Sequence, residues 1–291
     1  MQYDYLDRIR SSVTLYTRRK TSNVLDGSFS SVFRGRSLEF EDLKEYDFGD
    51  NVHDIDWKSS SRTGKTLIRR YVSEKKHNVL LVGDTGLKMT GNTPSGESKE
   101  EIAALTMGTI AYLADRQGAD FSFAWGGEKN CVFDYFRSGP EHLETLLYQY
   151  KEAVGTPGRL GFSETLYSAL DRTEKRMIII GVTDIDGLFG IDERLLKSLT
   201  YRNDFMLVCI DDISMLQAGA YDLDIARYVP RLFRFSGKLR AVEERERAAV
   251  MEKSRKLNTR FRVPMVTVSS ADRIVESVIE LFERYRNGFF R

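Results

Sequence analysis

Four short, continuous runs of apolar residues constrain the fold of this chain more than any other feature. They alternate with segments that repeat apolar residues at a helical period, such as 100–117, 140–153 and 163–173. Strands without a polar face are tolerated only where helices cover both faces of a sheet. The pattern therefore predicts an α/β fold with a mainly parallel sheet, whose strands include 79–82, 177–182, 205–210 and 263–268.

A further pair of predicted strands, 121–125 and 131–136, flanks Gly126 and Gly127. This short glycine-containing connection predicts a hairpin that adds one antiparallel strand at an edge of the sheet. Cys131 and Cys209 each lie inside an apolar, strand-like run, so we expect two buried free thiols.

The chain before residue 78 has a different pattern, which predicts an accessory segment over 1–77 and a sheet domain over 78–291. Residues 3–20 have the apolar spacing of an amphipathic helix. Strand-like pieces follow at 31–33, 37–40 and 66–72, and the polar segment 47–63 is typical of turns. The aromatic side chains expected to form a small core there are Phe40, Tyr46, Trp57 and Tyr71.

The charge of the chain is nearly balanced, with 44 lysine and arginine residues against 43 aspartate and glutamate residues. A general nucleic-acid binder would show a basic excess, so the composition disfavours that class. No run approaches the roughly 20 apolar residues that cross a bilayer, and residues 1–10 lack the apolar core of a signal peptide. We expect a cytoplasmic protein without direct membrane insertion.

Aspartates follow two of the predicted central strands. Asp84 comes after the first strand, and Asp184 and Asp186 come after the second. The carboxyl ends of parallel strands meet at one edge of a sheet, where ligands collect. Two interpretations stand equally: the carboxylates share a hard cation such as Mg²⁺, or each aspartate caps the helix that follows it or fixes a turn.

Enzyme motifs are incomplete in this sequence. Residues 61–66 end like a phosphate-binding loop but lack its first glycine and its strand-to-helix context. The enzyme alternative is a magnesium-dependent phosphohydrolase of the haloacid dehalogenase kind, with Asp84 as nucleophile. Such enzymes place a second aspartate two residues later, where this chain has Gly86. We therefore expect no enzymatic activity.

A succession of short blocks resembles the bacterial domain of unknown function 58 family. The blocks cover about Gly35 to Met89 and comprise Gly35-Arg36-Ser37-Leu38-Glu39-Phe40, Leu43-Lys44-Glu45-Tyr46, Gly49-Asp50, Ile55-Asp56-Trp57-Lys58, Ser61-Arg62-Thr63-Gly64 and Arg69-Arg70-Tyr71. His53 and Asp54 stand where the family usually has arginine. The resemblance implies a von Willebrand factor A-like domain of Rossmann type with one hairpin edge. It also implies association with a MoxR-type AAA+ ATPase. Relatives often carry two membrane helices before this region, and we expect this chain to be a version without them.

In von Willebrand A domains, a metal-ion-dependent adhesion site uses an aspartate and two serines after the first strand, a threonine from a later loop and an aspartate after another strand. Carried over by position, Asp84 and Asp184 match the two aspartates, with Asp186 as the alternate of the second. Gly86 and Lys88 replace the serines, and Ser163 or Thr165 could supply the remaining hydroxyl. The resemblance therefore implies a degenerate site that binds Mg²⁺ weakly or has no cofactor, with Asp84, Asp184 and Asp186 as the doubtful metal ligands.

Lysine has three donors and no acceptor, and a metal ion would repel it. One hypothesis is that Lys88 partly replaces the ion by pairing with Asp84 and Asp184; the other is that Lys88 points into solvent. Residues 238–262 carry nine basic and four acidic residues. This predicted helix either docks an acidic partner or an anionic surface, or is a solvated face of the domain.

Together these features predict a non-enzymatic protein–protein interaction module, an adaptor or assembly factor for the ATPase. Its partner would contact a rim at the carboxyl ends of the strands. The residues that define this rim are Asp84, Gly86, Lys88, Ser163, Thr165 and Asp184.

Overall fold

The computed structural model describes residues 4–19, 39–50, 52–72, 78–173, 175–217, 221–222, 227–229 and 236–289. The chain divides into a larger unit, Met1–Phe33 with His77–Arg291, and a smaller unit, Arg34–Lys76. Each unit is described by itself. The predicted strand 31–33 lies outside the described residues.

A six-stranded sheet forms the centre of the larger unit. Its strands lie in the order β10-β7-β6-β3-β4-β5. Every neighbouring pair is parallel except β4 and β5, which form the antiparallel edge. This arrangement confirms the predicted fold class. The strands are β3 (Asn78–Gly83), β4 (Asp120–Gly126), β5 (Cys131–Phe133), β6 (Ile178–Thr183), β7 (Asp204–Ile210) and β10 (Met265–Val268).

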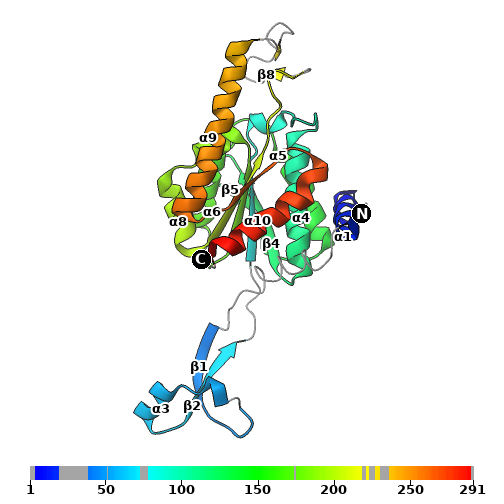
Figure 1. The fold of residues 1–291 in the computed structure, drawn as a ribbon. Coiled ribbons are helices and arrows are strands. Elements are labelled where there is room, and N and C mark those ends of the chain that lie inside the picture. Colours follow the sequence, from blue (N-terminus) through cyan, green and yellow to red (C-terminus); the bar gives the residue numbers. More distant parts are fainter. Residues whose placement is uncertain are drawn as a thin grey trace. The chain divides into compact units, whose positions relative to one another are not determined.

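Helices cover both faces of this sheet, as its apolar strands require. Side chains alternate between the faces, so that Val79 and Leu81 belong to one buried cluster and Leu80 and Val82 to the other. The first cluster includes residues of α1 (Asp4–Arg19), α4 (Lys99–Arg116), α5 (Pro140–Ala153) and α10 (Ile274–Phe289). The second includes α6 (Phe162–Asp171), α7 (Ile185–Gly190), α8 (Glu193–Arg202) and Leu257 of α9 (Gly237–Phe261). Figure 1 shows α8 and α9 on one side of the sheet and α1 and α4 on the other.

Helix α1 packs into the core of the larger unit, although the sequence pattern placed the boundary at residue 77. Leu6 and Ile9 are buried in the cluster that α4 and α5 share. The absence of a side chain at Gly108 lets the helix approach, since a Cβ atom there would lie 2.6 Å from Ile9. The buried carboxylate of Glu144 accepts hydrogen bonds from the backbone N–H groups of Tyr5 and Leu6. A carboxylate at this end of a helix also opposes the positive pole of the helix dipole.

The smaller unit contains an antiparallel pair of strands, β1 (Glu39–Glu45) and β2 (Leu67–Val72). The segment expected to consist of turns holds a 3-10 helix, η1 (Val52–Asp54), and an α-helix, α3 (Trp57–Thr63). Asp56 caps α3 by accepting from the Ser59 N–H and also accepts from the Arg69 side chain. Gly64 ends the helix in the left-handed conformation, with φ of 71°.

The prediction that Trp57 contributes to a small aromatic core in this unit is wrong, because Trp57 is 71% exposed. Trp57 is the first residue of α3. Tyr46 is half-buried. The side chains of Phe40 and Tyr71 lie outside what the structure describes.

Several short elements of the larger unit were not predicted. They include the helices α7 and α8, the 3-10 helices η2 (Leu87–Thr90) and η4 (Ala271–Arg273), and the paired β8 (Tyr221–Asp222) and β9 (Arg227–Tyr228). Cys131 and Cys209 are buried free thiols, as expected. Among the described residues, no helix combines the length and the apolar character that crossing a bilayer requires.

Candidate functional site

The two predicted aspartates lie at the point where the strand order of the sheet reverses. Numbered within the sheet alone, the order is 6-5-4-1-2-3, so that β3 and β6 are the first and fourth strands and are adjacent. Ligands in open α/β sheets bind beyond the carboxyl ends of the strands at this switch point. Asp84 directly follows β3, and Asp184 directly follows β6. The topology thus brings together two residues that are one hundred positions apart in the chain.

Asp84 is held by the protein itself. Its side chain is buried, with the residue 6% exposed. One carboxylate oxygen, Oδ1, accepts from the Gly86 N–H at 2.8 Å, and the other, Oδ2, accepts from the Thr183 hydroxyl at 2.5 Å. Burial raises the pKa of Asp84 and the charge of Asp184 raises it further, although the bond from Thr183 opposes both. Both oxygens therefore already have a donor.

Tyr150 of α5 fixes the backbone beneath Asp84. Its hydroxyl donates to the Asp84 carbonyl oxygen at 2.8 Å. Its ring packs on Gly83, where an added Cβ atom would lie 2.4 Å from the ring. Glycine at this position is needed for the close approach, and the tyrosine anchors the end of β3 to the helix that covers it.

Asp184 serves two roles with its two oxygens. Oδ1 accepts from the Gly187 N–H at 3.1 Å and caps α7. Oδ2 accepts from the ammonium group of Lys99 at 2.8 Å. The interpretation of Asp184 as a helix cap is therefore confirmed. The same carboxylate also forms an ion pair with Lys99.

Lys99 is the residue of this site that sequence reasoning missed. It is the first residue of α4 and its side chain is 1% exposed. Its ammonium group forms ion pairs with Asp184 and with Asp212, which follows β7. Burial alone would lower the pKa of Lys99, but the charges of Asp184 and Asp212 outweigh burial and raise it. The available signal was a lysine in the first turn of a helix, where the helix dipole disfavours a cation.

Above these buried groups lies a cavity of about 410 Å³, which we call the rim cavity. Its lining includes five of the six residues that define the rim, namely Asp84, Gly86, Lys88, Ser163 and Asp184, together with Asp186. Lys88 and Asp186 form an ion pair of 3.0 Å, with 45% and 59% of their side chains exposed. The lysine bound to Asp184 is thus Lys99, whereas the sequence-based hypothesis gave that position to Lys88.

Thr165 does not line the rim cavity. Its residue is 1% exposed, and its hydroxyl donates to the Gly161 carbonyl at 2.9 Å within the first turn of α6. Ser163, two residues earlier, does line the cavity. Of the two hydroxyls predicted from the resemblance, the one on the cavity wall is therefore that of Ser163.

The residues present fit a divalent ion poorly. Gly86 and Lys88 offer no side-chain oxygen, and both oxygens of Asp84 accept hydrogen bonds. In the part of the chain that the structure describes, no three side chains of the types His, Cys, Asp and Glu are grouped to hold a metal. The suggested ligand set Asp84, Asp184 and Asp186 does not form such a group, because Asp186 is turned to Lys88 at the surface.

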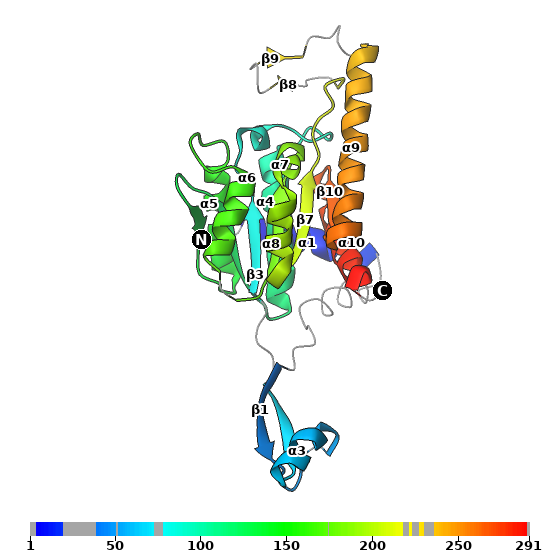
Figure 2. The ribbon, with the colours of Figure 1, turned by 90° about the vertical axis from the view of Figure 1, so that its left-hand side faces the viewer.

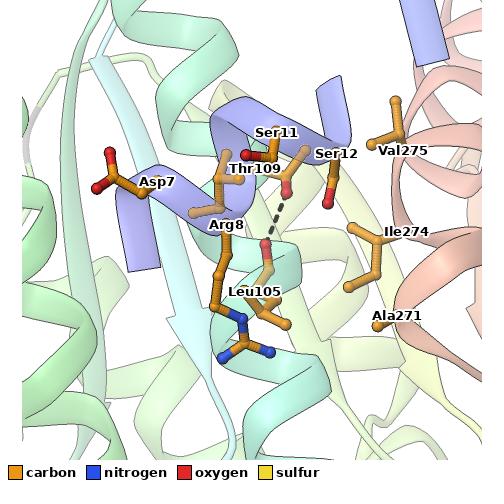
Figure 3. A pocket seen from close by; sticks show the side chains of 10 residues that line it. Asp7, Arg8, Ser11, Ser12, Leu105, Thr109, Ala271, Ile274 and Val275 are labelled. Carbon is orange, nitrogen blue, oxygen red and sulfur yellow. Dashed lines mark hydrogen bonds between the residues drawn. The ribbon is translucent and has the colours of Figure 1, made fainter. Parts of the chain in front are cut away.

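A second cavity, of about 450 Å³, lies between α1, α4 and α10. Figure 3 shows Ser11 and Ser12 of α1 near Thr109 of α4, with Ile274 and Val275 of α10 on the opposite wall. The Thr109 hydroxyl donates to the Leu105 carbonyl of its own helix. None of the predicted site residues lines this cavity.

Comparison with known proteins identifies the family. Residues 42–218 match the family described as "Protein of unknown function DUF58". Because this match covers more than half of the chain, the chain belongs to that family, as the sequence motifs predicted. The uncharacterized proteins Mb1516 of Mycobacterium bovis and Rv1480 of Mycobacterium tuberculosis are each 23% identical to it over 204 residues. The alignment covers 69% of this chain and 63% of theirs, so it spans less than two thirds of these relatives.

Solved structures similar to this chain include von Willebrand factor A domains. A von Willebrand factor type A protein from Catenulispora acidiphila is 12% identical, with a TM-score of 0.41 over 76% of this chain and 44% of that one. The VWA domain of SpRpn10 is 11% identical, with a TM-score of 0.39 over 70% of this chain and 94% of that one.

Proposed function

From the family membership and the geometry of the rim cavity, we propose that this chain is a non-enzymatic protein–protein interaction module that docks an acidic segment of a partner at the rim. One observation carries the proposal. The carboxylates at the switch point are engaged by the protein itself, whereas the cation at the mouth of the cavity, Lys88, is half exposed. The exposed groups at the mouth are Lys88 and its ion-pair partner Asp186, and in this proposal the Lys88 ammonium group receives a carboxylate of the partner.

The surroundings of Lys88 suit a docking contact. Its ion pair with Asp186 is exposed, and exposed pairs stabilise proteins by only about 0–1 kcal/mol. A carboxylate of a partner can therefore compete with Asp186 for the Lys88 ammonium group. Leu87, which precedes Lys88 and lines the same cavity, is 57% exposed. An acidic side chain flanked by apolar residues would match this combination of charge and apolar surface.

Asp84 is poorly placed for the alternative function, a phosphohydrolase. A nucleophilic aspartate needs an oxygen that can reach phosphorus, and catalysis of this kind needs acids that hold a metal. Here both Asp84 oxygens accept hydrogen bonds from Gly86 and Thr183. No observation of the site favours phosphoryl transfer over docking.

For the partner we propose a MoxR-type AAA+ ATPase, which the chain would serve as an adaptor or assembly factor. The support for this choice is the family to which the chain belongs and the association that the sequence resemblance implies. The degenerate adhesion site enters the proposal as the surface that the ATPase, or a client bound to it, contacts through an acidic segment.

The test is a binding titration with the purified ATPase of the same organism. Lys88→Glu reverses the charge at the mouth, and like charges brought together at an interface cost several kcal/mol. We expect at least about a tenfold loss of affinity, which corresponds to about 1.4 kcal/mol.

Lys175→Glu is the matched control, because Lys175 is exposed just before β6 and so lies at the opposite edge of the sheet. Equal affinity of both variants and the wild type would refute the rim as the docking surface. Turnover of p-nitrophenyl phosphate that disappears in Asp84→Asn would instead support the phosphohydrolase.

A further inference from the structure

The buried cluster below the rim cavity contains a permanent cation of the protein. Lys99, Asp184 and Asp212 come from the start of α4, the end of β6 and the end of β7. The Lys99 ammonium group contacts both carboxylates. Removing two opposite charges from water is costly, and such pairs persist only where geometry and hydrogen bonds compensate. Lys99 and Asp184, both almost fully buried, therefore depend on each other, and the partly exposed Asp212 adds a second negative charge beside the lysine.

The position of Lys99 in its helix has no local explanation. A cation in the first turn faces the positive pole of the helix dipole. The neighbouring Glu100 and Glu101 have the charge that this turn favours. The Lys99 side chain is 1% exposed, so burial and the helix dipole both disfavour its charge. A lysine in this position requires a specific electrostatic partner. Asp184 and Asp212 supply it.

The groups around Asp84 and Asp184 lack most of the oxygen ligands that a metal-ion-dependent adhesion site would use. The switch-point carboxylates Asp84 and Asp184 remain, but the two positions after Asp84 that would carry hydroxyl ligands are Gly86 and Lys88. The Thr165 hydroxyl bonds to its own helix, and the Asp84 oxygens bond to Thr183 and Gly86. What an ion would otherwise supply is positive charge beside Asp184, and Lys99 already provides it.

We propose that Lys99 is the resident cation of this site, so that its ammonium group takes the charge-neutralising place of a divalent ion between Asp184 and Asp212. The rim then has its binding geometry without metal. This inference concerns the charge balance of the protein itself and holds whether or not a partner docks at the rim. Its failure is therefore distinguishable from failure of the proposed function.

Thermal unfolding in EDTA and in Mn²⁺ tests the inference on the wild type and three variants, Lys99→Ser, Lys253→Ser and Asp184→Asn. The wild type should unfold at the same temperature in both solutions. Lys99→Ser leaves the buried Asp184 carboxylate without its cation, beside Asp212, whose side chain is 39% exposed. In EDTA its midpoint should fall by roughly 6 °C or more, as the loss of a partner from a buried ion pair predicts. Mn²⁺ should recover part of this loss.

Lys253→Ser is the control for removing a partly buried lysine, because the Lys253 ammonium group donates to the Ile191 carbonyl. Its midpoint should not respond to Mn²⁺. Two results would overturn the inference: a Mn²⁺-dependent rise in the wild-type midpoint that is lost in Asp184→Asn, or a Lys99→Ser midpoint in EDTA equal to that of the wild type. If Lys99→Ser does not fold, the wild-type titration decides alone.

Discussion

Buried charges at the end of the sheet are arranged so that each acid has a donor. Asp184 divides its oxygens between a helix cap and an ammonium group, and Asp84 divides its own between a hydroxyl and a backbone N–H. A buried polar group without a partner costs about 1–3 kcal/mol. The arrangement thus explains why acids at these positions are compatible with a stable sheet end.

His142 gives the protein a pH dependence that can be measured separately. Its ring stacks on Phe121, with a centroid distance of 5.3 Å, and its Nε2 atom is buried without a hydrogen-bond partner. Burial lowers the pKa of His142 below its usual 6.5; Asp134 opposes this shift and Arg137 adds to it. The unfolded chain therefore takes up this proton at a higher pH than the folded chain does.

We expect His142 to make the protein less stable as the pH falls through 6.5, because protonation then favours the unfolded state. The free energy of unfolding, measured by urea denaturation at a series of pH values, should decline less steeply for His142→Gln than for the wild type. Identical slopes for the two proteins across this range would show that the histidine is not the titrating group.

At the level of helices and strands, α7 is the most constrained element of the site. Gly187 lies in its first turn, and a Cβ atom there would lie 1.9 Å from the Thr183 Oγ1 atom and 2.5 Å from the Asp84 Oδ2 atom. The backbone of α7 is thus pressed against the hydrogen bond that holds Asp84. No side chain larger than hydrogen fits without movement of the helix or of this bond.

Gly187→Ala should accordingly destabilise the protein by about 1–3 kcal/mol, the usual cost of adding a methyl group to a packed site. Gly161→Ala is the control, because a Cβ atom at that helix start would meet its nearest neighbour at 3.7 Å. Urea denaturation of both variants provides the comparison. A Gly187→Ala protein as stable as Gly161→Ala would mean that α7 is not packed as described.

How well the sequence predicted each helix or strand depends on how many residues carry its apolar pattern. The long helices and the continuous apolar strands were predicted within a few residues, because burial on both faces leaves an unambiguous pattern. Helices α3, α7 and α8 were not predicted, although Asp56, Asp184 and Asp192 cap them. Helices α3 and α7 have seven and six residues, and in such short segments the apolar period is hard to distinguish from a loop. Helix α8 has ten residues, as α6 does, so its length does not explain why it was missed.

The site was predicted in part for a similar reason. Asp84 and Asp184 could be placed from strand ends, because topology alone brings such ends together. The pairing of Lys99 with Asp184 and Asp212 could not, since it depends on how α4, β6 and β7 are positioned in three dimensions. Lys88 was the nearer candidate in the chain, and proximity in sequence selected the wrong lysine.

In the larger unit as a whole, α9 is the element whose role remains a prediction. Figure 2 shows the first half of α9 extending beyond the carboxyl ends of the strands, where α7 lies. Glu243 of α9 accepts from the Ser214 hydroxyl in the segment that follows β7. Burial raises the pKa of Asp211 at the end of β7, and the charge of Arg247 of α9 opposes that shift. One basic residue of α9, Arg247, therefore acts on the same end of the sheet as the rim, and the docking of an acidic partner by α9 stays a prediction.

The central claim is that a partner contacts the mouth of the rim cavity, and site-specific photo-crosslinking to the purified MoxR-type ATPase tests it most directly. A photoreactive residue would replace Leu87, which is exposed at the mouth, or Tyr201, which is 81% exposed near the end of α8. The account predicts a crosslinked adduct from position 87, whose yield Lys88→Glu lowers strongly, and none from position 201. Adducts from position 201 alone would contradict it.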